Sequence, residues 1–587
     1  MLRKKLSPFF VNSKYIEGIT LGKKRRKKLA GNNLVDFKSS GDFANSFEYS
    51  KFLIFYFIIA VVVFIFFIRL FILTIVQGEK NRNLADNNRI RLINVETERG
   101  KIFDRNGVLL ASSKKIYLLH KDLRITEISQ STAEELEKSF LAGQNFEGEL
   151  GQVEQKVKRE YSAREILAHV LGYVTPVQKE DSSLSNSLEL RQIGRLGIEA
   201  TYDDFLKGKN GKKLIEVDAD EKRVSVLGNE PDEHGRDIHL TIDFNLQKFA
   251  NNSLQKHLNS AASKKGAIII QNPNSGEVLA LVSLPSFNPE DISQSLDGKN
   301  QPFLNRVTQG IYPPGSVFKI VSALSGLESG AITARTEIED VGEFYLGNVR
   351  FTNWYYLSYG GKDGLIKIDR AIARSNDIFF YRLAEKTGLN VIRQMAVKLG
   401  LGQKTGIDLP DESLGLVPDE TWKKSTKNAP WYLGDTLHFG IGQGFLQLTP
   451  LQINSITSFM AAGYLTRPYL VFKIDAENKK DEVKIESKIL SQNIVKEENF
   501  EIVRYGMKKA CEEGGTAWPF FNAPYKVGCK TGTAEKALGN PHAIFTAFAP
   551  FENPQVSITV IIEEGGEGSS VAAPVAREIL DWYFQKR

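Results

Sequence analysis

Cysteine and histidine are scarce in this sequence, with 2 Cys and 7 His among 587 residues. Two cysteines cannot build a disulfide framework, and the histidines show neither HExxH nor CxxC spacing, so no structural metal site is expected. Internal repeats and linkers rich in Gly or Ser are also missing. With 42% hydrophobic and 25% charged residues, the composition excludes collagen-like, low-complexity and wholly disordered chains. At roughly 150 residues per domain, the length allows about two to four folded units.

Positive charge is concentrated at the N-terminus. Residues 1–51 contain 12 Lys/Arg and only 4 Asp/Glu, an excess larger than the net charge of +6 of the whole chain. The remaining sequence is therefore slightly acidic. A basic tail on a nearly neutral body is a poor nucleic-acid binder, so no nucleic-acid partner is expected.

One long hydrophobic run follows the basic tail. Residues 52–76 contain a single charged side chain, Arg69, and as a helix these 25 residues would span about 37 Å. That length exceeds the ~30 Å hydrocarbon core of a bilayer. A buried core helix is the alternative, but core helices seldom stay apolar on every face; a cleaved signal peptide would have a shorter run. We expect a single-pass transmembrane helix over residues 52–76.

Charged residues close to this run do not decide its orientation. Lys38 and Lys51 on one side are balanced by four basic residues on the other: Lys80, Arg82, Arg89 and Arg91. The total charge of residues 1–51, together with the chemistry inferred below, favours a cytoplasmic tail. The large segment after the run is then extracytoplasmic, anchored to the cytoplasmic membrane.

The pattern of elements changes along the rest of the chain. From 77 to 235, short β-like stretches alternate with helical ones, and Asn-Gly pairs within 104–107 and 208–211 predict tight hairpins. From 236 to 587, about 350 residues form a hairpin-rich α+β pattern that is long enough to bury a large core. Its clearest features are strands at 238–242, 267–271 and 278–282, a helix at 246–258 and a turn at 274–276.

A Pro-Pro-Gly stop before an apolar helix places a serine in a reactive position. Ser316 follows Pro313-Pro314-Gly315, so it lies at the helix start, where free N–H groups and the helix dipole favour negative charge. Lys319 returns to the same face one turn later. A desolvated lysine can remove the proton of a serine, although the same pattern fits a capping serine followed by a solvated lysine.

Two further motifs are weak when taken alone. Ser375-Asn376-Asp377 precedes an apolar helix and also fits an ordinary helix cap. Lys530-Thr531-Gly532-Thr533 lies on an expected strand, paired with another at 543–550. Small residues there let a substrate backbone approach, and Lys530 offers a cation to an anionic group. The order S-x-x-K, then S-x-[DN] 59 residues later, then K-T-G a further 155 residues on, is the signature of penicillin-recognising serine enzymes.

The sequence resembles the class B penicillin-binding proteins over most of its length. Segments 99–107 and 194–199 are similar to the family's pedestal, and 240–243, 276–280 and 440–444 to its transpeptidase domain. Asp377 and the Tyr-Pro-Pro-Gly-Ser start resemble most the penicillin-binding protein 2 branch, the elongation-type D,D-transpeptidases. The resemblance implies an α+β fold with four parts. These are a basic tail (1–51), a single N-terminal transmembrane helix (52–76), an elongated mixed α/β pedestal of dimerisation type (77–235), and a transpeptidase domain (236–587) whose central antiparallel sheet has helices on both sides.

The resemblance also implies a catalytic role for each motif residue. Ser316 would attack the D-Ala-D-Ala carbonyl of a peptidoglycan stem peptide and release D-alanine, and β-lactams would acylate the same hydroxyl. Lys319 would be the general base, with a pKa lowered by burial and neighbouring cations. Ser375 would relay a proton to the leaving amine. Asp377 would hydrogen-bond the substrate and Lys319, in preference to acting only as a helix cap.

The third motif would complete the set of catalytic and binding residues. Lys530 and Thr531, beside Gly532, would hold the terminal carboxylate of the donor peptide. The backbone N–H groups of Ser316 and Thr533 would form the oxyanion hole. An amine from a second stem peptide would then take the acyl group and create the cross-link that cell-wall elongation and cell shape require.

The sequence shortly before the second motif offers no soft metal ligands. Some relatives carry a His/Cys/Asp metal cluster shortly before the second motif, but residues 340–377 contain no His and no Cys, so we expect no metal and no other cofactor. Cys511 and Cys529 could pair in an exported domain or stay free, and the sequence leaves this open. His542 is expected to be a packing residue at a strand edge.

Other classes share parts of the pattern. A serine β-lactamase would lack the pedestal and the anchor, a β-lactam sensor would have several membrane spans, and a bifunctional synthase would need a glycosyltransferase domain that residues 77–235 are too short to hold. An inactive structural relative would not need three intact motifs. Because the chain has no domain that polymerises glycans, the resemblance implies a SEDS-family glycosyltransferase and other elongation-complex proteins as partners. The acceptor amine, any carboxypeptidase activity and the oligomeric state stay open.

Overall fold

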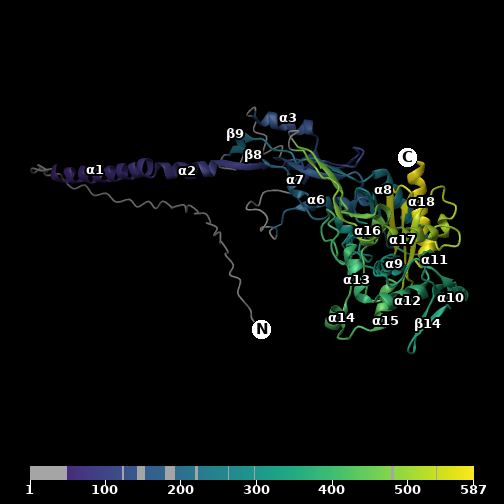
Figure 1. Cartoon of the computed structure of the whole chain (residues 1–587). Coiled ribbons are helices and arrows are strands. Elements are labelled where there is room, and N and C mark those ends of the chain that lie inside the picture. Colours follow the sequence, from purple (N-terminus) through teal and green to yellow (C-terminus); the bar gives the residue numbers. More distant parts are fainter. Residues whose placement is uncertain are drawn as a thin grey trace, which may run out of the picture. The chain divides into compact units, whose positions relative to one another are not determined.

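The computed structural model describes residues 49–586 except 122–123, 142–151, 179–180, 182–191, 218–222, 262, 297, 477–481 and 537–538. The chain divides into two compact units, residues 1–85 and 86–587. Figure 1 labels the elements along the chain. The basic charge expected at 1–51 falls almost entirely outside the described residues.

The first unit contains the hydrophobic run. Helix α1 (Tyr49–Phe71) passes into a π-helical turn, η1 (Ile72–Val76), and α2 (Gly78–Arg89) begins two residues later. Within the described residues, 52–76 is the one helical segment long and apolar enough to cross a membrane, and none of it is buried. Bulky side chains such as Phe57 and Phe66 are 69% and 70% exposed. An exposed, uniformly apolar helix fits a lipid environment and not a protein core.

Two sheets organise the segment that follows. The first has the antiparallel order β1 (Ile90–Val95), β8 (Gly211–Val217), β9 (Arg223–Glu230). The second runs β19-β18-β10-β2-β3-β4, and β5 also pairs with β3. Its strands are β2 (Ile102–Phe103), β3 (Leu109–Lys121), β4 (Arg124–Ile128), β5 (Gln152–Tyr161), β10 (Ile238–Leu240), β18 (Val471–Ile474) and β19 (Val483–Lys484). Because β10 pairs in parallel with β2 and antiparallel with β18, segments far apart in the sequence share this sheet.

One of the two hairpins predicted from Asn-Gly pairs is confirmed. Residues 104–107 join β2 to β3, and Asp104 Oδ1 accepts hydrogen bonds from the backbone N–H groups of Asn106 and Val108, both at 2.8 Å. The hairpin predicted at 208–211 is wrong, because these residues connect helix α7 (Asp203–Leu206) to β8. The side chain of Asn210 accepts a hydrogen bond from the N–H of Thr97 at 3.1 Å. It therefore binds a distant segment of the chain and does not stabilise a hairpin turn.

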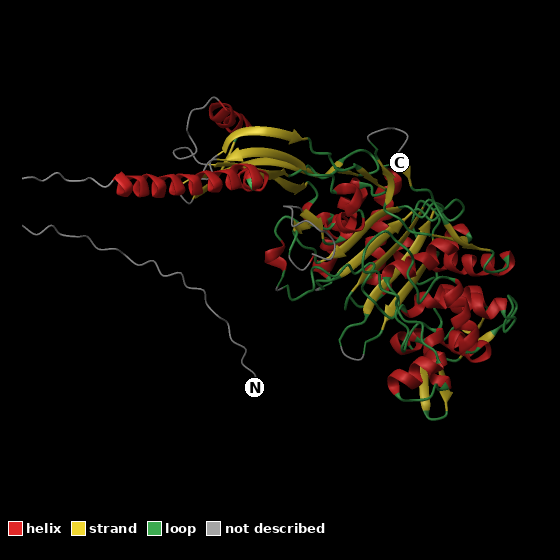
Figure 2. Cartoon of the chain, turned by 90° about the vertical axis from the view of Figure 1, so that its left-hand side faces the viewer, coloured by secondary structure: helices red, strands yellow, loops and turns green. Residues whose placement is uncertain are grey.

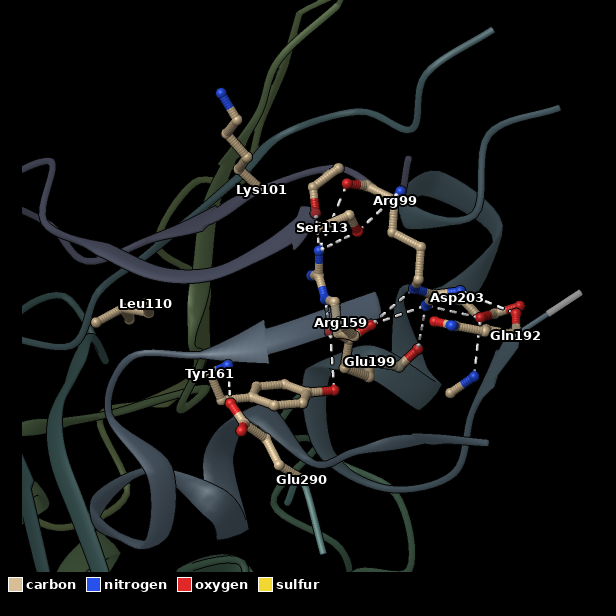
Figure 3. A network of polar contacts seen from close by, with 12 residues as sticks. Arg99, Lys101, Leu110, Ser113, Arg159, Tyr161, Gln192, Glu199, Asp203 and Glu290 are labelled. Carbon is tan, nitrogen blue, oxygen red and sulfur yellow. Dashed lines mark hydrogen bonds and ion pairs between the residues drawn. The ribbon is translucent and has the colours of Figure 1, made fainter. Parts of the chain in front are cut away.

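A buried ionic cluster ties this region together (Figure 3). Glu199, on α6 (Gly197–Thr201), is 0% exposed and accepts hydrogen bonds from Arg99 at 2.8 and 3.0 Å and from Arg159 of β5 at 2.7 Å. Arg99 also pairs with Asp203 at 2.8 Å. The Tyr161 hydroxyl donates to Glu199 at 3.4 Å. One carboxylate thus joins the segment before β2 to a strand and a helix more than 40 residues away in sequence.

The larger domain is built on a five-stranded antiparallel sheet, visible in Figure 2, with the order β12-β11-β23-β22-β21. Alternate residues of β22 enter opposite cores: Ala543, Phe545 and Ala547 pack with one cluster, Ile544 and Phe548 with another. Helices α8 and α18 cover the first face and α16 the second. The bounds are β11 (Gly266–Gln271), β12 (Val278–Leu284), β21 (Gly528–Ala534), β22 (His542–Ala549), β23 (Val556–Ile562), α8 (Phe244–Ser260), α16 (Pro450–Ala462) and α18 (Ala573–Gln585).

These strands and helices confirm the predicted sheet flanked by helices, with boundaries that differ by at most two residues. Smaller elements surround it. Those of the N-terminal half are α3 (Gln130–Leu141), η2 (Arg164–Ile166), α5 (Ala168–Leu171), β6 (Val174–Pro176), β7 (Gln192–Gly194) and η4 (Ile292–Ser295). Those near the site are η5 (Gly315–Phe318), α9 (Lys319–Glu328), β13 (Ile338–Asp340), β14 (Glu343–Leu346), β15 (Val349–Thr352), α10 (Trp354–Tyr359), β16 (Gly364–Ile366), α11 (Ile368–Arg374), α12 (Asp377–Thr387) and α15 (Leu433–Gly440). The rest are α13 (Leu389–Lys398), α14 (Glu420–Lys427), β17 (Tyr464–Thr466), β20 (Ile489–Gln492), α17 (Glu497–Ala510), η7 (Trp518–Phe520) and η8 (Gly568–Ala572).

Candidate active site

Ser316 lies in a tight turn that opens a buried helix, in which every residue from Lys319 to Leu327 is buried. The turn is the 3₁₀ segment η5, which continues directly into α9. Gly315 adopts a left-handed backbone (φ +54°), and a Cβ there would lie 2.7 Å from the carbonyl oxygen of Thr533. Its N–H donates to the carbonyl of Gly442 at 2.9 Å. Glycine is therefore required for the serine turn to lie against β21.

Lys319 is fully buried beneath the turn. Its amine donates to Asp377 Oδ1 at 2.6 Å and to the carbonyl of Ser375 at 2.7 Å, and lies 3.4 Å from Ser375 Oγ. Burial lowers the pKa of Lys319, and the Asp377 carboxylate opposes that shift. Within the described residues no hydrogen bond joins Lys319 to Ser316, so its amine is held on the side of the second motif.

Ser375 occupies a strained backbone position between two helices. It ends α11 in the left-handed conformation, with φ +54°, which non-glycine residues rarely adopt and which clusters at functional sites. Asn376 then caps α12, its side chain accepting the N–H of Phe379 at 2.9 Å. The helix-cap interpretation of this motif is thus correct for Asn376, while Ser375 and Asp377 face Lys319.

The K-T-G strand brings a second buried amine to the same serine. Lys530 is 0% exposed and donates to Ser375 Oγ at 2.8 Å and to the carbonyl of Thr531 at 2.9 Å. Burial, reinforced by the charge of Lys319, lowers the pKa of Lys530 well below its ordinary value. Gly532 allows close packing here, because a Cβ at this position would lie 3.0 Å from the side chain of Val317.

The charges at this centre do not balance if both amines are protonated. Asp377 is the single carboxylate that pairs with Lys319 among the described residues, and Lys530 has no carboxylate partner of its own there. Two cations with one anion in a buried site are unfavourable because the low dielectric strengthens their repulsion. Burial and mutual repulsion therefore favour one neutral amine, which is the state that a general base requires.

The motif residues border one cleft of about 510 Å³. Ser316, Ser375, Asp377, Thr531 and Thr533 line it, whereas Lys319 and Lys530 lie fully buried behind its wall. The structure therefore brings all three motifs together. Gly532 adjoins them in β21 between Thr531 and Thr533.

Several lining residues were not identified from the sequence. Gln443 lies in the 440–444 segment noted for its resemblance, and its amide donates to the carbonyl of Thr533 at 3.2 Å. His438, Trp518, Glu535 and Glu567 also line the cleft. Glu535 directly follows β21 and the third motif, whereas the others come from segments distant in sequence, and no local pattern distinguishes them from ordinary surface residues.

Cys511 and Cys529 form a disulfide with a Cα–Cα distance of 6.1 Å, which settles the point that the sequence left open. The bond joins the residue after α17 to the strand residue preceding Lys530. Among the described residues there is no group of three or more His, Cys, Asp or Glu side chains that could hold a metal ion.

Comparison with known proteins gives a consistent result. Residues 266–581 match the penicillin-binding protein transpeptidase domain, and 123–240 match the penicillin-binding protein dimerisation domain. The chain is 31% identical to the peptidoglycan D,D-transpeptidase MrdA of Escherichia coli K12, covering 87% of this chain and 90% of that protein.

Solved structures agree with this assignment. A complex of penicillin-binding protein PBP2 with MreC from Helicobacter pylori is 27% identical, covers 85% of this chain and 99% of the PBP2 chain, and has a TM-score of 0.70. A chain from a peptidoglycan synthase complex that coordinates polymerization and crosslinking is also 27% identical, covers 92% of this chain and 99% of its own, and has a TM-score of 0.73. With three serine-enzyme motifs around one cleft and matches over nearly its whole length, this chain belongs to the class B penicillin-binding proteins, in the branch of the MrdA (PBP2) transpeptidases.

Proposed function

We propose that this chain is a serine-type peptidoglycan D,D-transpeptidase of cell-wall elongation, with Ser316 as its nucleophile. The observation that carries the proposal is the convergence of Ser316, Ser375, Asp377, Thr531 and Thr533 on one cleft, in front of two buried amines. Acyl transfer through a covalent intermediate needs an activated hydroxyl, a base and an anion-binding wall in one place.

The first half-reaction forms an ester. Ser316 Oγ attacks the carbonyl carbon of the penultimate D-alanine, and its proton passes to the neutral amine of Lys319. The backbone N–H groups of Ser316 and Thr533 stabilise the developing oxyanion, at about 3–4 kcal/mol for a single donor. The C–N bond then breaks, and the departing D-alanine amine receives a proton through the hydroxyl of Ser375, which lies 2.8 Å from Lys530 and 3.4 Å from Lys319.

Substrate binding adds a negative charge to the site. The terminal carboxylate of the donor peptide, held beside Lys530 and Thr531, stabilises the ammonium form of Lys530. The positive charge of Lys530 in turn opposes a second proton on Lys319, so a protonated Lys530 and a neutral base at Lys319 are compatible in the substrate complex.

The second half-reaction resolves the ester. An amine from another stem peptide attacks the ester carbonyl, the C–O bond to Ser316 breaks, and the proton lost by the amine returns to Ser316 Oγ. A β-lactam follows the first half-reaction only, because its leaving nitrogen stays tethered to the acyl group after the ring opens. Stable labelling by penicillin is therefore the expected signature, and rapid turnover would indicate a β-lactamase.

The experiment is covalent labelling of the full-length chain in detergent with a fluorescent penicillin, followed by mass spectrometry of the labelled peptide. Ser316→Ala is expected to abolish the label. Ser329→Ala, at the end of the same helix and exposed, is the matched control and is expected to label normally. Labelling of another serine, or of the Ser316→Ala variant, would refute the assignment.

We further propose a single-pass arrangement with residues 1–51 in the cytoplasm and the cleft outside the membrane. Peptidoglycan is assembled on that side, and the apolar helix over 52–76 would be the anchor. A SEDS-family polymerase and an MreC-like scaffold are the proposed partners, supported by the named complexes of the relatives. Protease accessibility of the two sides in right-side-out membrane vesicles tests the orientation.

A further inference from the structure

The loop that carries Ser375 and Asp377 rests on a buried carboxylate that belongs to none of the three motifs. Asp340, the last residue of β13, is 2% exposed. Its Oδ2 accepts hydrogen bonds from the side-chain amides of Asn353 (2.8 Å) and Asn376 (2.7 Å) and from the backbone N–H of Asp363 (3.0 Å). Its Oδ1 accepts the N–H of Gly342 at 2.8 Å.

Both amides that bind Asp340 act directly on the position of Asp377. Asn353, fully buried, accepts the backbone N–H of Asp377 at 3.2 Å, and the next N–H, of Trp354, donates to Asp377 Oδ2 at 3.0 Å. Asn376 caps α12, the helix that Asp377 begins. Asp377 is thus held at its backbone by Asn353, at its carboxylate by Trp354 and at its helix end by Asn376.

A second carboxylate closes the network from the other side. Asp363 Oδ2 accepts the amide of Asn376 at 3.0 Å, and its Oδ1 accepts Arg374 Nε at 3.0 Å. Trp354 Nε1 donates to the carbonyl of Arg374 at 3.0 Å. The residue that follows Arg374 is Ser375, in its left-handed conformation, so the network surrounds the strained position on both sides. Tertiary contacts that over-determine a segment are what keep such a backbone in place.

We propose that Asp340 is the positioning residue of the catalytic base: through Asn353 and Asn376 it fixes the Asp377 carboxylate, which in turn fixes the amine of Lys319. This inference rests on the proposed function and adds to it a residue that contacts neither substrate nor Ser316. Asp340 acts through four donors, and a neutral amide in its place could not accept all of them, because its NH₂ group would face a donor.

The protonation of Lys319 provides a readout that a purely structural role would not change. The charged groups facing its amine within the described residues are Asp377 from α12 and Lys530 from β21. Lys319 must be neutral to accept the proton of Ser316, so its pKa sets the acid limb of the acylation profile. Asp377 stabilises the ammonium form. If Asp377 moves away, that stabilisation weakens, and the acid limb moves to lower pH.

The test measures the rate constant for acylation by a fluorescent penicillin as a function of pH, with the full-length chain in detergent. Asp340→Asn is expected to lower the maximal rate by about 100-fold, the effect of misplacing a catalytic group by about an ångström, and to shift the acid limb to lower pH. Asp408→Asn is the matched control. Asp408 is also a carboxylate that accepts three hydrogen bonds, from Tyr202, Leu470 and Val471, and none of these partners lines the cleft. The acid limb of the Asp408→Asn rate profile should coincide with that of the wild type.

A second variant separates positioning from folding. Asn376→Ser keeps an N-cap hydroxyl for α12, since serine caps helices well, but removes the amide that reaches Asp340 and Asp363. It is expected to show the same downward shift of the acid limb, and it decides the question if Asp340→Asn does not fold. The inference would be overturned if the acid limb is unchanged in both Asp340→Asn and Asn376→Ser. It would also be overturned if these variants, like Asp408→Asn, lose labelling only in proportion to the fraction of unfolded protein. A wild-type chain that fails to label at Ser316 would instead overturn the proposed function together with this inference.

Discussion

Replacing Glu199 by glutamine should favour local unfolding of the pedestal segments around this residue. Glu199 is 0% exposed and is the carboxylate on which Arg159 depends, because Arg159 makes its ion pair with Glu199 at 2.7 Å and its Nη2 has no partner within the described residues. Arg99 retains Asp203 at 2.8 Å in the variant. One buried guanidinium therefore loses the counter-charge that the described part of the chain provides for it. Breaking a buried ion pair in this way costs about 3–5 kcal/mol.

Hydrogen–deuterium exchange of the full-length chain measures this loss where it occurs. Every 1.4 kcal/mol is a factor of ten in the opening equilibrium, so amides of β5 and α6 should exchange at least about 100-fold faster in Glu199→Gln. The control is Glu385→Gln, which breaks the exposed pair between Arg382 and Glu385; such pairs contribute about 0–1 kcal/mol. Penicillin labelling of Ser316 should persist in both variants.

The same cluster predicts a pH dependence with a definite sign. Burial alone would raise the pKa of Glu199, but the charges and hydrogen bonds of Arg159 and Arg99 outweigh it and leave the pKa below the ordinary value of 4.5. A depressed pKa in the folded state contributes stability above the unfolded-state pKa that is lost as the pH falls through the folded-state value. Protection of β5 should therefore decrease at acid pH in the wild type and not in Glu199→Gln. Equal exchange in the two glutamine variants at neutral pH would refute this account of the cluster.

Two further predictions concern the site and the partners. Lys319→Ala should slow acylation of Ser316 by at least about 100-fold, because the hydroxyl loses its base. The acid limb of the rate profile should disappear in this variant. An unchanged rate of labelling by fluorescent penicillin would mean that another group removes the proton. Exchanging residues 52–235 for those of a division-type relative should break co-purification with the elongation polymerase while penicillin labelling of Ser316 continues. A chimera that still co-purifies with and activates the polymerase would place the coupling outside this segment.

Local sequence signals predicted the framework of the catalytic domain well. The strand expected at 543–550 is present as β22, paired with β23, because its β-branched and aromatic residues, buried on both faces, favour a strand. The Pro-Pro-Gly stop predicted the start of the helix at Ser316. The Asn-Gly pair in residues 104–107 predicted the hairpin between β2 and β3. Each of these is decided within about ten residues of chain.

Turn chemistry was misleading where a distant segment used the turn residues. The Asn-Gly pair at 210–211 predicted a hairpin, but Asn210 accepts the N–H of Thr97, 113 residues away, and the turn joins a helix to a strand. The pairing of Cys511 with Cys529 was also left open by the sequence. Spacing in the sequence does not fix the distance between two side chains, whereas the packing of α17 on β21 does.

By itself, the sequence predicted which residues would carry the chemistry: a serine, two lysines, a second serine and an aspartate, in an order that one enzyme family shares. Only the tertiary structure decided how they act on one another. The amine of Lys319 points to Asp377 and Ser375, 56 to 58 residues away, and Ser375 adopts a left-handed backbone surrounded by Asp340 and its amide partners. Burial at the meeting of α9, α12 and β21 shifts the lysine pKa values. A protonation state depends on charge and desolvation contributed by several segments at once, and such a property is not encoded in any one of them.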